Sequence, residues 1–407
     1  MRGKTILLAV AGGIAAFKAA ALTSMLTKAG ASVHVLMTSA AKEFVGVQTF
    51  QALSRNPVYD DTFTEKVPHQ IAHIDLADKA DLILVAPATA NIIAKLASGQ
   101  ADDMVTTTIL ASKAPVWVAP AMNVNMYDHP AVRDNLNRLK SFGYEVFEPG
   151  EGLLACGWIG KGRLPEPEDL FSSMEDYFFS KEHPPLLRGK RIMITAGPTR
   201  EPIDPVRYIT NYSSGKMGYA LAKAAKRLGA HVTLIAGPTD LKAPAVDEFV
   251  PVVTTADMYE AANSRFAACD AVIKSAAVAD YRPKQVLEKK YKKTAESTDW
   301  SIELVENPDI LKSLGERKKT NQVLIGFAAE TNDLMTNALA KIAKKNLDAV
   351  VANDVSQSGI GFHSDENEVT IFFKNGTSEL VSQRTKDDVA YEVCKALARL
   401  LNQREEA

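Results

Sequence analysis

The chain has 407 residues, of which 46% are hydrophobic and 24% charged, and its formal net charge is -2. This composition predicts a globular protein of two or three domains, and the small net charge argues against a nucleic-acid or membrane surface. Three cysteines are too few for a disulfide framework and favour a reducing, cytoplasmic compartment. No apolar run is long enough to span a membrane, and glycines break the apolar start of the chain, which argues against a signal peptide.

The first half of the chain alternates short apolar runs with stretches of helical periodicity. Strands are predicted at 5–10, 32–37, 81–86, 115–119 and 144–147, with intervening helices such as 14–29 and 90–97. This alternation predicts a parallel sheet that helices cover on both faces. Segment 181–190 is rich in charge and proline, so we interpret it as a linker and residues 1–180 as the first domain.

A second apolar run begins at Lys190 and also ends in a glycine turn, so the pattern of the first half starts again. Strands are predicted at 191–196, 231–236, 248–253, 270–275, 322–327 and 347–351, and helices at 216–229, 255–267, 307–319 and 332–345. Residues 368–382 are predicted to form a hairpin that turns at Asn375-Gly376, a last helix follows over about 385–402, and the lysine-rich segment 283–299 is predicted to be a mobile loop. We therefore expect two three-layer α/β domains: a flavodoxin- or Rossmann-like parallel sheet, then a Rossmann-like domain with a β-hairpin over 191–407.

The turns after the first two strands indicate a phosphate site. Gly12 and Gly13 follow the first strand without the GxGxxG spacing of a dinucleotide site, and the second strand ends at Thr38-Ser39 instead of an acidic residue. Hydroxyls and helix N-terminal amides suit a phosphate monoester, which favours flavin mononucleotide (FMN) over a nicotinamide dinucleotide. The alternative is that Thr38 and Ser39 only cap a helix.

Small polar residues also follow the third and fourth strands, where open sheets hold ligands. These strands end in APATAN (86–91) and APAMNVNMY (119–127). His73 precedes the third strand and Asn123 follows the fourth, although a structural histidine and a turn asparagine are the alternatives. Three glycines in ACGWIGKGRL (155–164) predict a flexible loop, where a cysteine is a poor candidate for core packing.

Together these segments resemble the flavin-dependent cysteine decarboxylases, and among them the phosphopantothenoylcysteine decarboxylases, over residues 1–180. Trp158 departs from the family pattern, in which a more polar residue often stands there. The resemblance rests on GGIAAFK (12–18), His73, PAMNVNM (120–126) and ACGWIGKGR (155–163).

The resemblance implies that His73 assists oxidative decarboxylation, that Asn123 binds the substrate carboxylate and that Cys156 donates a proton. It also implies bound FMN, held by residues at the strand ends. These residues are Gly12, Gly13, Ile14, Ala15, Thr38, Ser39, Pro87, Ala88, Thr89, Asn91, Thr106, Thr107, Ala121 and Met122.

In the second half, SSGKMG (213–218) is not a P-loop, because Met217 follows Lys216 and no glycine lies five residues before Gly215. It remains a plausible anion site at a helix start, with an ordinary Ser-capped helix as the alternative. Lysines at several strand ends could together neutralise a triphosphate, although for any one of them a solvated surface is the preferred explanation. Asp280 could hold a metal ion such as Mg²⁺ or a ribose hydroxyl.

Residues 190–402 resemble the bacterial, CTP-using phosphopantothenate–cysteine ligases through AGPTREPIDPVRYITNYSSGKMG, AAVADYR, NPDIL, GFAAET and ANDV. The resemblance implies that Asn211 and Lys290 act on an acyl-cytidylate, with Lys289 as the alternative to Lys290. It implies CTP and metal binding at Asp280. The implied CTP-binding residues are Gly197, Ser213, Gly215, Ala276, Ala277, Asp280, Lys290, Asn307, Pro308, Asp309, Ile310, Phe327, Lys341 and Lys345.

The two resemblances together imply a bifunctional enzyme of coenzyme A biosynthesis, both a ligase and a carboxy-lyase. It would join cysteine to 4'-phosphopantothenate with CTP and then decarboxylate the product to 4'-phosphopantetheine. One alternative is a flavin-dependent decarboxylase of another cysteinyl substrate with an appended nucleotide-binding domain. Another is a non-enzymatic flavoprotein subunit that regulates a phosphatase, which the presence of Cys156 argues against. Trimer contacts among flavin domains and dimer contacts among ligase domains would close a homo-oligomer, plausibly a dodecamer.

Overall fold

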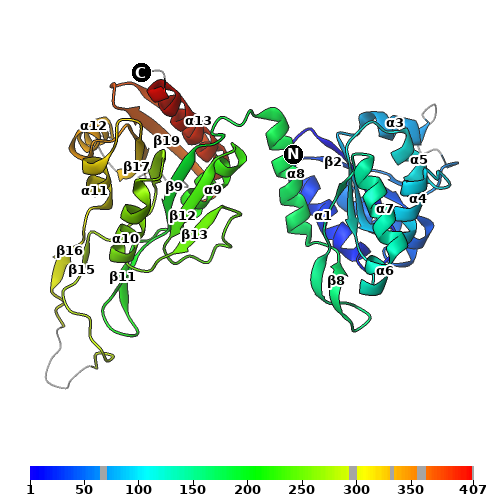
Figure 1. Cartoon of the computed structure of the whole chain (residues 1–407), viewed down its shortest axis with the longest axis horizontal. Coiled ribbons are helices and arrows are strands. Elements are labelled where there is room, and N and C mark those ends of the chain that lie inside the picture. The colour runs from blue at the N-terminus through cyan, green and yellow to red at the C-terminus, as the bar shows by residue number, and fades with distance from the viewer. Residues whose placement is uncertain (65–70, 293–299, 331–333, 355–363, 406–407) are drawn as a thin grey trace. The chain divides into compact units, whose positions relative to one another are not determined.

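Each half of the chain builds its own sheet (Figure 1). The computed structural model describes residues 1–64, 71–292, 300–330, 334–354 and 364–405. By internal contacts the chain divides into two units, Met1–Phe179 and Ser180–Ala407. None of the described helices has the length and hydropathy that crossing a membrane requires.

The first sheet is parallel throughout, with the strand order β3-β2-β1-β4-β5-β6. The chain runs outward from β1 to β3 and returns to β4 on the other side of β1. A crevice therefore opens where the carboxyl ends of β1 and β4 diverge, which is where such sheets bind ligands. The strands are β1 (Thr5–Val10), β2 (Ser32–Met37), β3 (Val58–Tyr59), β4 (Leu82–Ala88), β5 (Val116–Pro120) and β6 (Glu145–Val146).

Helices cover this sheet, and most of them were not predicted individually. They are α1 (Ala16–Lys28), η1 (Ser39–Glu43), α2 (Val47–Ser54), α3 (Ala72–Lys79), α4 (Ala90–Ser98), α5 (Met104–Ala111), α6 (Val124–Asp128), α7 (Pro130–Ser141) and α8 (Pro167–Glu182). The expectation of a loop over 155–164 is wrong for residues 159–163. These residues form half of a hairpin of β7 (Gly150–Leu153) and β8 (Ile159–Arg163), because glycines in β8 let its backbone pack closely against a neighbouring segment.

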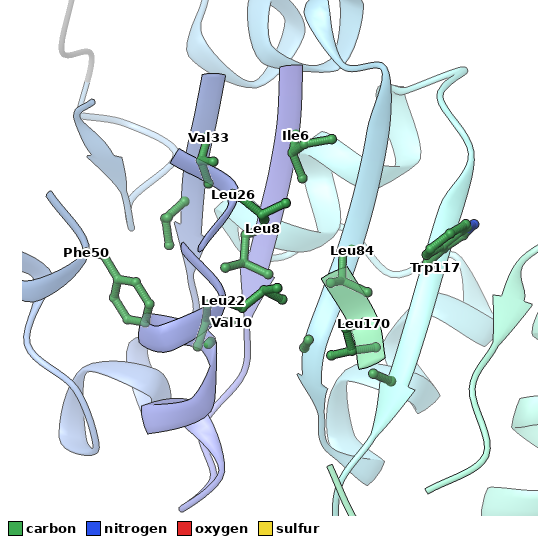
Figure 2. Close-up of a cluster of buried hydrophobic side chains, with 14 of the residues drawn as sticks. Ile6, Leu8, Val10, Leu22, Leu26, Val33, Phe50, Leu84, Trp117 and Leu170 are labelled. Carbon is green, nitrogen blue, oxygen red and sulfur yellow. The ribbon is translucent and has the colours of Figure 1, made fainter. Parts of the chain in front are cut away.

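The strands of the first sheet are apolar on both faces because helices bury both. Ile6, Leu8 and Val10 of β1 point into a cluster with Leu22 and Leu26 of α1 (Figure 2). The intervening Leu7 and Ala9 belong to a second cluster on the opposite face. Burying one such large aliphatic side chain contributes about 1.5–3 kcal/mol, so this alternation stabilises both layers.

The second sheet has the strand order β13-β12-β9-β14-β17-β18-β19-β20, and its first six strands repeat the order of the first sheet. Those six are parallel, whereas β19 runs antiparallel to β18 and pairs with β20 in a hairpin. The amino end of β19 therefore lies at the edge where the parallel strands have their carboxyl ends. The strands are β9 (Arg191–Ala196), β12 (His231–Ala236), β13 (Glu248–Pro251), β14 (Ala271–Lys274), β17 (Val323–Glu330), β18 (Ala349–Asp354), β19 (Glu366–Phe373) and β20 (Ser378–Thr385).

The predicted hairpin and the five predicted helices of this half are present. The helices are α9 (Lys216–Arg227), α10 (Thr255–Phe266), α11 (Ile310–Arg317), α12 (Leu334–Lys345) and α13 (Lys386–Glu405). Two short antiparallel ribbons were not predicted. They are β10 (Arg200–Pro202) with β11 (Tyr208–Thr210), and β15 (Tyr281–Pro283) with β16 (Leu304–Glu306).

Two segments that we interpreted as irregular chain carry specific contacts. In the expected linker, α8 continues to Glu182, and buried Leu187 donates its N–H to the Leu228 carbonyl at 2.9 Å. In the expected mobile loop, the carbonyl of Tyr291 accepts from the Arg207 guanidinium at 2.8 Å, while residues 293–299 lie outside the described residues. The described part of that loop is therefore tied to the chain between β10 and β11.

Candidate functional site

The loops after β1, β4 and β5 lie together at one edge of the first sheet. Ala11 donates its N–H to the Pro87 carbonyl at 3.3 Å, and Ala121 donates to the Ala88 carbonyl at 3.0 Å. The structure thus gathers Gly12, Gly13, Pro87, Ala88, Ala121 and Met122, which were predicted from sequence to share a site. A Cβ at Gly12 would lie 2.4 Å from the Ala40 Cβ, so this glycine lets η1 pack against the turn.

The hydroxyl groups predicted at this edge differ in whether they are free to donate a hydrogen bond to a ligand. The Thr38 and Thr89 oxygens accept N–H groups as the caps of η1 and α4, which leaves their hydroxyl hydrogens as donors. Thr106 is fully buried and shares a capping box with Asp103, so its hydroxyl faces the protein. Thr107 is half-buried, and Ile14 and Asn91 are exposed. The expected helix-capping role of Thr38 is present, and it is compatible with binding a phosphate.

His73 lies in the first turn of α3, which packs against α5. Its Nδ1 is buried without a hydrogen-bond partner. Such an orphaned ring nitrogen is uncommon in a folded protein and is a reason to look for a ligand. Among the described residues, no hydrogen bond joins His73 to Asn123 or Cys156.

Asn123 and Cys156, 33 residues apart, are brought into direct contact. Asn123 caps α6, and its Nδ2 donates to the Cys156 Sγ at 3.1 Å. Cys156 is exposed at the turn between β7 and β8. The hydrogen bond from Asn123, and next the backbone N–H of Trp158, lower the pKa of the Cys156 thiol below its usual value.

Glycines in β8 bring this turn to Asn123. A Cβ at Gly162 would lie 2.1 Å from the Met122 carbonyl oxygen, and one at Gly160 would lie 2.9 Å from Val124 Cγ2. Met122 also donates its N–H to the Gly162 carbonyl at 3.0 Å. The glycines therefore allow β8 to pack closely against residues 122–124 of the same chain.

A cavity of about 550 Å³ opens at the carboxyl edge of the second sheet. It holds almost every residue for which the ligase resemblance implied CTP binding, together with Asn211. The lining includes Gly197, Asn211, Ser213, Gly215, Ala276, Ala277, Asp280, Asn307, Pro308, Asp309, Ile310, Phe327, Lys341 and Lys345. Lys290 and its alternative Lys289 are exposed and absent from the lining, because both lie beyond β15 on the segment that leads to β16.

Asn211 lies at the rim of the cavity with its amide orientation fixed. Its Nδ2 donates to the carbonyls of Ala277 at 3.1 Å and Val278 at 3.0 Å. An amide nitrogen has two hydrogens, so both are engaged. The implied role of Asn211 on an acyl-cytidylate stays a prediction.

Lysines gather on one side of the cavity. Lys345 forms an ion pair with Asp309 at 2.8 Å, and Lys341 donates to the Phe327 carbonyl at 3.2 Å. Lys274, at the end of β14, donates to the Ala276 carbonyl at 2.8 Å. Burial, and then repulsion from Lys341 and Lys345, lower the pKa of Lys274 to about 8. This concentration of positive charge suits a polyphosphate.

Sequence reasoning missed some lining residues. Lys274 ends an otherwise apolar strand, which was the signal that could have identified it. Asn353 at the end of β18, Asn367 at the start of β19 and Lys386 at the start of α13 also line the cavity. The Oδ1 of Asn367 is buried without a hydrogen-bond partner.

Asp280 is one of the carboxylates that reach this cavity. Among the described residues, no group of three or more His, Cys, Asp or Glu side chains could hold a metal ion by itself. A Mg²⁺ ion here would therefore take most of its ligands from phosphate and water, which is common for magnesium bound with nucleotides.

Comparisons with known proteins cover both units. The family model described as "Flavoprotein" matches residues 1–178, and the one described as "DNA/pantothenate metabolism flavoprotein C-terminal domain" matches residues 187–401. The chain is 56% identical over 404 residues to the coenzyme A biosynthesis bifunctional protein CoaBC of Bacillus subtilis, covering 99% of this chain and 98% of that protein. Its identity to the Escherichia coli protein of the same name is 44% over 385 residues, or 94% of each chain.

A solved structure is also similar to the second unit. It is the C-terminal domain of a coenzyme A biosynthesis bifunctional protein CoaBC, with 46% identity and a TM-score of 0.46, covering 54% of this chain and 98% of that one.

Proposed function

Because this chain belongs to the family of bifunctional coenzyme A biosynthesis proteins, we propose that its second unit acts before its first. The protein combines phosphopantothenate–cysteine ligase and phosphopantothenoylcysteine decarboxylase activities. The ligase product carries the cysteinyl carboxylate that the decarboxylase removes. The order of the reactions is therefore the reverse of the order of the units along the chain.

In the second unit, CTP activates the carboxylate of 4'-phosphopantothenate as an acyl-cytidylate, with release of pyrophosphate. The amine of cysteine then attacks this mixed anhydride, forming the amide and releasing CMP. The lysines beside Asp309 and the loop before α9 support this proposal, because both can neutralise phosphate groups. Asp280 would hold a Mg²⁺ ion, which would neutralise part of the phosphate charge. Lys290, which is exposed, remains a proposed catalytic residue that would stabilise negative charge on the reacting phosphate.

Asn211→Asp is expected to let the cytidylate accumulate. The carboxylate would face the Ala277 and Val278 carbonyls that the amide now donates to, and like partial charges would turn it away from the site. Pyrophosphate release in the absence of cysteine should then exceed the amide formed after cysteine is added. Asn321→Asp makes the same change at an exposed position and should leave both steps unchanged. Unimpaired amide formation by Asn211→Asp would show that Asn211 is not needed to convert the acyl-cytidylate into the amide.

Lys274→Met is expected to raise the KM for CTP. A hydrogen bond from a charged group contributes about 1.5–3 kcal/mol, so the increase should be tenfold or more. Phosphate binds the protonated lysine, and the pKa of Lys274 is about 8. CTP affinity of the unaltered protein should therefore fall as the pH rises through this value, and Lys274→Met should flatten that dependence. The KM for CTP between about pH 7 and pH 9 is the measurement, with exposed Lys312→Met as the control. An unchanged pH profile in Lys274→Met would refute the assignment.

In the first unit, FMN binds at the edge where the loops after β1, β2, β4 and β5 meet. The hydroxyls of Thr38 and Thr89 and the small residues of the turns fit a phosphate monoester, and no carboxylate follows β2 to repel it. The proposed FMN residues are Gly12, Gly13, Ile14, Ala15, Thr38, Ser39, Pro87, Ala88, Thr89, Asn91, Thr106, Thr107, Ala121 and Met122.

When bound, FMN supplies the oxidation and reduction that let the cysteinyl carboxylate leave as CO2. His73, in the first turn of α3, assists the decarboxylation. Asn123 binds the substrate carboxylate through Nδ2. Cys156 donates the proton that completes the product, 4'-phosphopantetheine.

The contact between Asn123 and Cys156 carries the proposal for the first unit, and the lysine-lined cavity carries it for the second. Incubating the purified protein with 4'-phosphopantothenate, cysteine and CTP should yield pyrophosphate, CO2 and 4'-phosphopantetheine. Without CTP, none of the three should form. Absence of cysteine-dependent amide formation would favour a decarboxylase for another cysteinyl substrate. Light scattering would test the proposed dodecamer, which a monomer would contradict.

A further inference from the structure

The side chain of Asn123 is held by its oxygen. Oδ1 accepts the N–H of Asn125 at 2.8 Å as the cap of α6. Only the oxygen of an amide can accept a hydrogen bond, so this contact fixes which way the group faces. The nitrogen is consequently turned toward the hairpin, where it donates to the Cys156 Sγ at 3.1 Å.

The turn that carries Cys156 presents backbone N–H groups to its sulfur. The Leu154 N–H donates to the Trp158 carbonyl at 2.7 Å and closes the turn, and the backbone N–H groups of Trp158 and of Cys156 itself add to Asn123 in lowering the pKa of the thiol. N–H donors stabilise a thiolate more than a thiol, because hydrogen bonds to a charged acceptor are the stronger ones.

The charged side chains on the neighbouring elements lie opposite or pair with one another and do not act on Cys156. Glu151 and Lys161 face one another across the base of the hairpin, and Asp128 at the end of α6 pairs with Arg133. None of them is among the causes that act on the thiol. Hydrogen bonding, chiefly from Asn123, is therefore what sets its acidity.

We propose that Asn123 is a positioning residue for Cys156, which orients the thiol and stabilises the thiolate that remains after proton transfer. This inference rests on the proposed role of Cys156 as proton donor. In that step the S–H bond breaks, the proton passes to the substrate and the electron pair stays on sulfur, where the Asn123 N–H accommodates it. The second N–H of Nδ2 remains for the substrate carboxylate, so one amide serves both the acid and the substrate.

The substitution Asn123→Asp keeps one contact of this side chain, the helix cap, and removes the other, the hydrogen bond to sulfur. Aspartate caps a helix as well as asparagine does, so α6 retains its start, but the donor to sulfur is lost. Asn123→Ser also keeps a capping oxygen, adds no charge and is too short to reach the sulfur. Asn125→Asp is the matched control, because it places the same charge on α6 and leaves the Asn123 side chain unchanged.

The test is the rate at which iodoacetamide alkylates the full-length protein with its flavin bound, measured against pH. Burial raises the pKa of Cys269 to about 11 and that of Cys394 to about 12, so alkylation near neutral pH reports Cys156. In Asn123→Asp and Asn123→Ser, the profile should shift to higher pH and the rate at pH 7 should fall severalfold. Asn125→Asp should keep the profile of the unaltered protein.

A profile in Asn123→Ser that coincides with that of the unaltered protein would overturn the inference, as would an equal shift in Asn125→Asp and Asn123→Asp. The measurement needs no substrate, so it stands even if the protein fails to decarboxylate. Conversely, a shifted profile with normal CO2 release and normal product would show that Asn123 sets the thiol acidity without limiting the reaction, and would contradict its positioning role.

Discussion

Replacing Cys156 with serine is expected to stop formation of 4'-phosphopantetheine while CO2 is still released. A hydroxyl is a much weaker acid than a thiol, and the hydrogen bonds from Asn123 and Trp158 that favour a thiolate here cannot close that difference. Loss of a general acid typically costs about 10²–10⁴-fold in rate, and the later step should fall by this factor. Both products are measured in one reaction, CO2 by trapping and 4'-phosphopantetheine by chromatography.

The matched control for this substitution is Cys269→Ser. Cys269 is buried in the second unit and donates to the Arg265 carbonyl at 3.3 Å, a contact that a serine hydroxyl can also make. It should retain both products in their normal ratio. Normal 4'-phosphopantetheine formation by Cys156→Ser would show that another group supplies the proton.

Gly162→Ala is expected to abolish most of the decarboxylase activity and to spare the ligase. The new Cβ would lie 2.1 Å from the Met122 carbonyl oxygen, a separation that real structures do not tolerate, so β8 must move away from the segment between β5 and α6. A displacement of about 1 Å in a catalytic group can cost about 10²-fold in rate. Since Cys156 is carried by this hairpin and Asn123 follows β5, CO2 release and product formation should both fall by about this factor.

Pyrophosphate release by the second unit provides an internal reference for this variant. Gly143→Ala is the matched control, because Gly143 has a φ of +87° but nothing within 4 Å of a new Cβ. That change should only lower the stability, by about 1–2 kcal/mol, because a residue with a Cβ is strained in this left-handed conformation. If Gly162→Ala decarboxylates normally, the hairpin does not need its observed position for catalysis.

Elements with strong apolar patterns could be predicted from the sequence. The strands predicted at 5–10, 32–37, 191–196 and 231–236 match β1, β2, β9 and β12 residue for residue. The ribbons β10–β11 and β15–β16 could not be predicted, because strands of three residues have no periodicity and depend on their partners. The β7–β8 hairpin was not predicted, because its glycines are typical of a loop. In the structure Gly160 and Gly162 allow close packing against the segment 122–124.

In the two sites, as in the fold, individual residues could be predicted from local sequence, but contacts between distant segments could not. Asn123 and Cys156 were identified as candidates, but their contact depends on a hairpin whose pairing the sequence pattern concealed. The orientation of Asn211 follows from carbonyls 66 and 67 residues away, so no local pattern indicates that its nitrogen is engaged. Asn367 joins the cavity because β19 runs antiparallel, a choice of direction that hydrophobic patterning does not specify.

Because β19 runs antiparallel, two kinds of segment line the cavity of the second unit. Parallel strands supply it with βα loops, which are tied to the core through the helices that follow them. The amino ends of β19 and α13 supply Asn367 and Lys386 from a hairpin at the margin of the sheet. Substitutions at these two positions leave every βα loop intact, so this side of the cavity can be altered without changing the loops that follow the parallel strands.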